Sequence, residues 1–108
     1  FVVNLADTRT ERFAQVGITL QMEDAKAAEM LKGYMPAVRN QILMLLAHKT
    51  SQELMTREGK EDLARAVGRA AALAMGLKVA EGPAPHPGEI RASDNPVRAV
   101  HISSIIIQ

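Results

Sequence analysis

Two helical patterns separated by a short break, over residues 35–67, constrain the fold of this chain more than any other feature. Val38, Ile42 and Leu45 recur at three- and four-residue intervals, which places them on one face of a helix. A second apolar stripe with the same spacing follows the break and continues beyond this stretch: Leu63, Val67, Ala70, Ala74 and Leu77. The two stripes predict a pair of helices that need a further layer to cover them.

The break at residues 49–53 has the sequence of a helix start. Thr50 is followed three residues later by Glu53, which fits a capping box: the threonine oxygen accepts a free backbone N–H, and the glutamate reaches back to the N–H of the cap residue. The stretch therefore predicts a helical hairpin. We expect its second helix to run from about Thr56 to Lys78, where Gly76 and Lys78 suit a helix end.

Strand patterns lie on both sides of the hairpin. Residues 1–5 are mostly apolar with two valines, and residues 7–10 resemble a turn. Within residues 12–22, every second side chain from Ala14 to Met22 is apolar, and the positions between hold glutamine, glycine or threonine. The first two strands are close enough in sequence to form an antiparallel hairpin. Residues 97–108 predict the last strand. Simple alternation there places Val100, Ile102 and Ile106 on one face and His101, Ser103, Ile105 and Ile107 on the other.

The segments between these elements carry their own signals. Asp24 is placed to cap a helix that begins after the second strand. Pro36 lies inside the apolar pattern that follows, so we expect either one kinked helix or two helices meeting there. Residues 79–96 hold four of the five prolines, and they predict a long extended loop.

The order β-β-α-α-β predicts an α+β fold, in which a small antiparallel sheet carries the helical hairpin on one face. A length of 108 residues suits a single domain, residues 1–108. Aromatic residues make up only 3% of the chain, so the core is expected to be aliphatic and rich in methionine. The chain has no cysteine, which excludes disulfides and thiolate chemistry. Its longest apolar runs fall far short of the ~20 residues that span a bilayer.

The sequence offers no catalytic, metal or cofactor site. His48, His86 and His101 lack metal-ligand spacing, and residues 58–60 (EGK) lack the glycine and hydroxyl partners of a phosphate-binding loop. Residues 103–104 (SS) have no nucleophile-elbow glycines around them. These observations predict a small module that is not an enzyme.

The charged side of the second helix mixes both signs. It carries Glu58, Lys60, Glu61, Asp62, Arg65 and Arg69, and the spacing predicts an ion pair between Glu61 and Arg65. Such a face is either simply solvated or a contact between copies of the domain. Nucleic acid is an unsuitable partner, because the net charge is only +1 and few aromatic side chains are available for stacking.

Five segments carry a resemblance to a known family. They are FVVNL at 1–5, MPAVRNQIL at 35–43, KTSQEL at 49–54, EGKEDL at 58–63 and IIIQ at 105–108. Together, in this order and spacing, they resemble FliL, the flagellar basal-body-associated protein. Residues 79–96 and the approach to the last strand at 95–100 depart from the family pattern.

The resemblance implies a single-pass protein of the bacterial inner membrane, with this chain as its periplasmic domain and a cytoplasmic tail and transmembrane helix missing before Phe1. It implies a fold similar to the stomatin (SPFH) domain. It also implies a homo-oligomeric ring around the stator proteins MotA and MotB that supports torque, without catalytic residues. For contacts between copies or with a partner, we expect Arg39, Glu58, Lys60 and Arg65.

Two other classes stay open on the sequence. One is a stomatin-like scaffold of some other membrane complex. The other is a small-molecule-binding or enzymatic α+β domain, which a concave pocket with convergent polar groups would favour.

Overall fold

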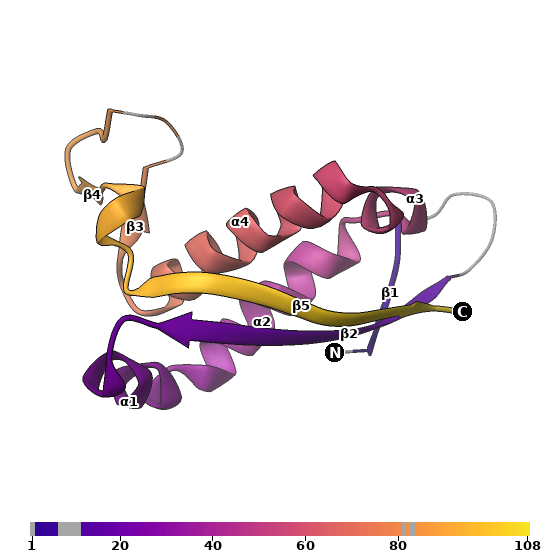
Figure 1. Cartoon of the computed structure of the whole chain (residues 1–108), viewed down its shortest axis with the longest axis horizontal. Coiled ribbons are helices and arrows are strands. Elements are labelled where there is room, and N and C mark those ends of the chain that lie inside the picture. Colours follow the sequence, from indigo (N-terminus) through magenta and orange to yellow (C-terminus); the bar gives the residue numbers. More distant parts are fainter. Residues whose placement is uncertain (1, 7–11, 81, 83) are drawn as a thin grey trace.

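A three-stranded antiparallel sheet forms one layer of the molecule (Figure 1). The computed structural model describes residues 2–6, 12–80, 82 and 84–108. Strands β1 (Val2–Asn4), β2 (Phe13–Met22) and β5 (Val97–Ile107) are arranged in the order β1-β2-β5. The predicted pairing of the first two strands is confirmed. The turn predicted at residues 7–10 lies outside the described residues.

The helices form the second layer. They are α1 (Ala25–Gly33), α2 (Met35–Ala47), α3 (Ser51–Met55) and α4 (Arg57–Ala74). The two long helices, α2 and α4, contact each other, and α4 also packs against β5 (Figure 1). The α+β fold with a helical hairpin on the sheet is therefore confirmed.

Helix starts follow the predicted caps. The Asp24 carboxylate accepts a hydrogen bond from the Ala27 N–H at 2.7 Å. Thr50 and Glu53 form the predicted capping box, with both of its bonds at 3.2 Å. Of the two alternatives at Pro36, the structure has two helices. The first, α1, ends at Gly33, and α2 starts at Met35 with Pro36 in its first turn, where its missing N–H costs no hydrogen bond.

The capping box starts α3, a helix of only five residues, and α4 begins afresh after Thr56. The Thr56 hydroxyl accepts from the Gly59 N–H at 2.9 Å and donates to the Glu53 carbonyl at 3.1 Å. Gly59 lies so close to α3 that a Cβ atom added to it would be 1.7 Å from the backbone carbonyl oxygen of Glu53. A tight elbow thus joins the two helices, and α4 ends at Ala74, earlier than predicted, before Gly76 with φ +86°.

Aliphatic side chains from β2, α2, α3 and α4 meet between the layers. The largest fully buried ones are Leu46, Leu54, Leu63, Val16, Val38 and Val67. The expectation of a methionine-rich core holds in part, because Met22 and Met35 pack against the core. Met75 is buried, but Met30, Met44 and Met55 are more than half exposed, at 52%, 53% and 65%. These three methionines therefore lie at the surface of α1, α2 and α3.

The face assignment predicted for the last strand is wrong beyond Ile102, whereas Val100 and Ile102 share the inner face as predicted. Gly17 pairs with Ser104 and Ile18 pairs with Ile102, so Ser103 is an extra residue in a β-bulge. Beyond the bulge the alternation shifts by one residue, and Ile105 and Ile107 pack against the core while Ile106 is 50% exposed. The bulge therefore keeps Ile102, Ile105 and Ile107 on the same inner face.

Residues 79–96 are not simply a loop. Strand β3 (Lys78–Val79) pairs in parallel with β4 (Glu89–Ile90), and a short 3-10 turn follows at Ala92–Asp94. The buried Asn95 side chain donates to the Gly68 carbonyl of α4 at 3.2 Å and accepts from the Val97 N–H at 2.9 Å. These bonds fix the segment to α4 before β5 begins.

Candidate functional site

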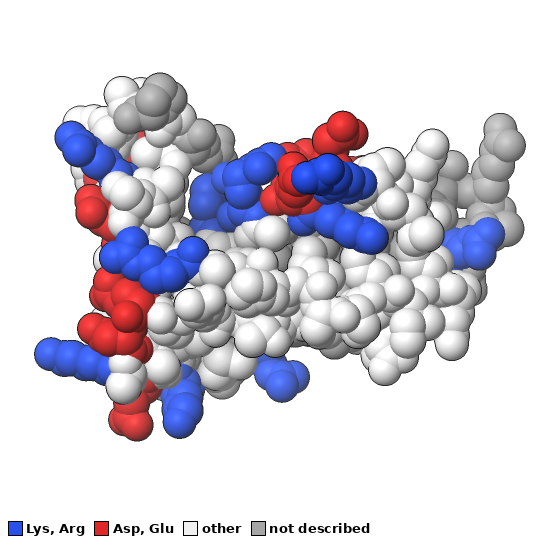
Figure 2. Space-filling model, in the orientation of Figure 1, with Lys and Arg blue, Asp and Glu red and all other residues white. Residues whose placement is uncertain are grey.

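Charged side chains concentrate on the outer side of α4 and near the α1 end of the molecule, whereas the outer face of the sheet is largely uncharged (Figure 2). On the sheet, exposed neutral residues such as Gln15, Thr19 and Gln21 alternate with the buried ones. His101 lies among them, with its Nε2 atom 3.3 Å from the Gln21 Oε1 atom. The sheet and the helix thus present surfaces of different polarity.

The ion pairs on α4 differ from the predicted one. Glu61 pairs with Arg57, with Oε1 and Nε 3.3 Å apart, and Arg65 pairs with Asp62. The predicted pair between Glu61 and Arg65 is therefore wrong. Arg57 and Glu61 are four residues apart, and Asp62 and Arg65 are three apart; both spacings bring side chains together on a helix. Both pairs are well exposed and contribute little stability.

The structure distributes the four predicted interface residues over two helices. Arg39 lies on α2, and all four side chains are exposed. On α4, Glu58 and Arg65 are seven residues apart and share one stripe. Lys60 lies on a different stripe, in line with Leu63 and Val67, and stays exposed because it belongs to the first turn.

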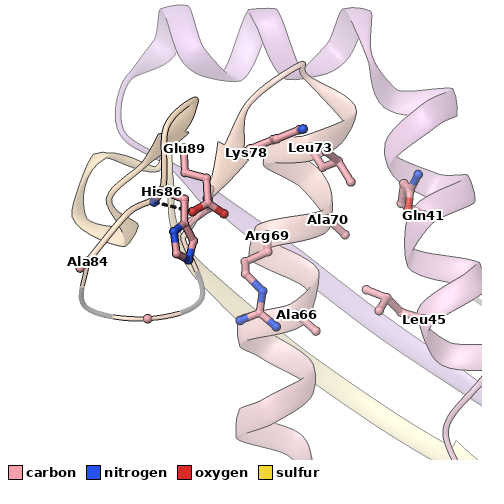
Figure 3. Close-up of a pocket in the computed structure, with 12 residues that line it drawn as sticks. Gln41, Leu45, Ala66, Arg69, Ala70, Leu73, Lys78, Ala84, His86 and Glu89 are labelled. Carbon is pink, nitrogen blue, oxygen red and sulfur yellow. Dashed lines mark hydrogen bonds between the residues drawn. The ribbon is translucent and has the colours of Figure 1, made fainter.

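A cavity of about 520 Å³ lies where α2, α4 and the β3–β4 segment meet (Figure 3). Its apolar lining comes from α2, α4 and the β3–β4 segment: Leu45, Ala66, Ala70, Leu73, Val79 and Ala84. Its polar lining comes from three parts of the chain: Gln41, Arg69, Lys78, His86 and Glu89. We call this cavity the α2–α4 groove. Its size falls within the range of natural ligand sites.

Among the described residues, positive charge prevails in the lining of the α2–α4 groove. Arg69 and the His86–Glu89 turn lie on one side, with Gln41 and Leu45 across from them (Figure 3). The Glu89 carboxylate accepts from the His86 backbone N–H at 2.8 Å. No carboxylate of a described residue forms an ion pair with Arg69 or Lys78. The described lining therefore holds two cations and one anion.

The prediction of site residues did not find this groove. The sequence assigns His86 no role and places Arg69 on a charged face that is either solvated or a contact between copies, because no local pattern relates the two residues. The parallel pairing of β3 with β4 brings Lys78 and Glu89 together, and two-residue strands leave no periodicity to read. In residues 79–96 the closely spaced prolines are the strongest local pattern, and that pattern favours an extended loop.

The remaining side chains offer little for catalysis. Among the described residues, no three His, Asp or Glu side chains are grouped so as to hold a metal ion. Ser103 and Ser104 occupy the β5 bulge, where the Ser103 hydroxyl lies over Gly17. Within the described part of the chain, no helix is both long and apolar enough to cross a membrane.

Comparison with known proteins identifies the family. The family model described as "Flagellar basal body-associated protein FliL" matches residues 1–108. The chain belongs to the FliL family. This family consists of flagellar accessory proteins and not of enzymes.

Individual FliL proteins match over a shorter region. The flagellar protein FliL of Aquifex aeolicus is 35% identical over 63 residues, which is 58% of this chain and 39% of the relative. FliL of Escherichia coli K12 is 38% identical over 63 residues, which is 58% of this chain and 40% of the relative, and FliL of Shigella flexneri gives the same figures. The chain thus matches about two fifths of the length of these relatives.

Proposed function

We propose that the protein is a non-catalytic accessory component of the flagellar motor that supports the stator proteins MotA and MotB during torque generation. Copies of it would form a ring-like scaffold around the stator units, on the periplasmic side of the inner membrane. The observation that carries this proposal is the match of the FliL family over residues 1–108. In this proposal residues 1–108 are one domain of stomatin-like fold, attached to the membrane by a preceding helix.

The surface of the molecule fits a role in assembly. An interface between copies needs a rigid frame, and the α3–α4 elbow and the bulged β2–β5 pair supply two fixed elements. The charges of α4 suit a polar interface rim, where they set register and association rate more than affinity. We assign contacts between copies to Arg39, Glu58, Lys60 and Arg65.

The test is swimming speed of a deletion strain and its parent as medium viscosity is raised. Under the proposal the deficit grows with load, because stator units that lack support are lost from a loaded motor. Complementation with the wild-type gene returns the speed to normal. Equal speeds of the two strains at every viscosity would contradict a role in stator support.

A further inference from the structure

We propose that the α2–α4 groove binds an extended peptide segment that carries carboxylates next to aliphatic side chains. The groove is separate from the α4 residues to which we assign contacts between copies. None of Arg39, Glu58, Lys60 and Arg65 lines it. The proposal therefore does not depend on the ring.

Charge complementarity selects an anionic ligand. Arg69 is half-buried on α4 and Lys78 is exposed on β3, and neither has a carboxylate partner among the described residues. A partly desolvated guanidinium gains most from a carboxylate, which it can bind with two parallel N–H···O bonds. Glu89, the one described anion of the lining, forms no ion pair with either cation, and its carboxylate is held by the His86 backbone N–H.

The apolar part of the lining selects aliphatic side chains beside the carboxylate. Leu73 is 48% exposed although it lines the groove, so apolar surface is left open to solvent. Ala66 and Ala70 have short side chains, so the backbone of a ligand can approach α4 closely. Leu45 of α2 lies on the opposite side of the groove (Figure 3). A leucine or valine of the ligand would cover this surface.

The open side of the groove favours a peptide over a small molecule. Sites for small molecules enclose most of the ligand surface. Here helices border two sides, the β3–β4 segment borders a third, and the remaining side opens to solvent. An extended segment lies across such an opening and continues beyond it.

The experiment measures fluorescence polarisation of three labelled hexapeptides with the purified chain. Their sequences alternate leucine with aspartate, with asparagine or with lysine. We expect saturable binding of the aspartate peptide and at least about tenfold weaker binding of the other two, since only the first pairs with Arg69 and Lys78. Equal binding of the aspartate and asparagine peptides would overturn the proposal.

Variants locate the binding site. Arg69→Glu with Lys78→Glu should weaken binding of the aspartate peptide by about tenfold or more. The matched control, Lys26→Glu with Lys32→Glu, changes the net charge equally on α1, and neither residue lines the groove. An equal loss in the control would mean non-specific attraction and would refute the site. Circular dichroism checks that each variant is folded.

A second pair of variants tests the apolar contact. Leu73→Ser should weaken binding severalfold, whereas Leu43→Ser, at a similarly exposed position of α2 outside the groove, should not. Hexanoate tests the alternative source of the same chemistry. Saturable displacement of the peptide by millimolar hexanoate would assign the groove to small carboxylates and overturn the peptide assignment.

Discussion

Gly59 lies where the backbones of α3 and α4 come closest. Its N–H is bound by Thr56, and the Glu53 carbonyl occupies the space that a side chain would need. The sequence EGK at 58–60 thus has a structural reason that is unrelated to phosphate binding. The Thr50 cap could be predicted because it acts within three residues, whereas the close approach of α3 to α4 depends on the angle between them.

Replacing Gly59 by alanine should lower the free energy of unfolding by about 1–3 kcal/mol, the usual cost of forcing extra atoms into a packed site. The contact is with backbone, so the elbow must open. Urea unfolding measures the change.

Gly33→Ala is the control, because no atom lies within 4 Å of the added Cβ. It should leave stability unchanged or raise it by up to about 1 kcal/mol. If both glycines tolerate alanine equally, the elbow is not as tight as described.

Strand β5 shows why the faces of an element are harder to predict than its existence. The run of three isoleucines near its end clearly indicates a strand. Which of them face the core depends on the bulge at Ser103, and a bulge leaves no local sequence signal beyond two serines. Likewise, β3 and β4 form only because the chain returns along Val79 after the proline-rich part.

The bulge makes a prediction about deletions. Removing Ser103 takes out the extra residue, so Ile102, Ile105 and Ile107 keep the inner face. Stability should change by less than about 1 kcal/mol, as for other exposed positions. Thermal unfolding of the deletion variant measures this.

Removing His101 instead is the informative comparison. It would make Val100 and Ile102 adjacent, and neighbouring residues of a strand point to opposite faces. One of the two would leave the core, at a cost of about 1–2 kcal/mol, since both are only partly buried. Equal stabilities of the two deletion variants would contradict the register.

At the scale of the whole molecule, the fold class and the helical hairpin were predictable because hydrophobic period alone determines them. The α2–α4 groove was not. Its lining residues come from three parts of the chain that only the tertiary structure brings together, such as Gln41, Arg69 and Glu89. The predicted interface residues are at the surface, and their role stays a prediction.

Self-association through α4 gives a prediction for the whole assembly. The double variant Lys60→Glu with Arg65→Glu should reduce chemical cross-linking between copies of the protein expressed in cells, because like charges then meet across the rim. The unfolding temperature should stay the same, since both side chains are exposed and the Arg65–Asp62 pair contributes at most about 1 kcal/mol.

Lys26→Glu with Lys32→Glu again serves as the control of equal charge, and it should leave cross-linking intact. Undiminished cross-linking in the α4 variant would remove Lys60 and Arg65 from the interface. Peptide binding in the α2–α4 groove would be unaffected by that outcome.

The pairing of β2 with β5 also governs when the protein can fold. Ala14 pairs with Ile107, so the longest strands of the sheet come from opposite ends of the sequence. Strand β5 follows α2 and α4 in the chain, so one edge of β2 stays unpaired while these helices can already form. Contacts between such distant residues form slowly. Until β5 pairs with it, that edge of β2 presents free backbone N–H and C=O groups, and it can pair with any other extended segment that it meets.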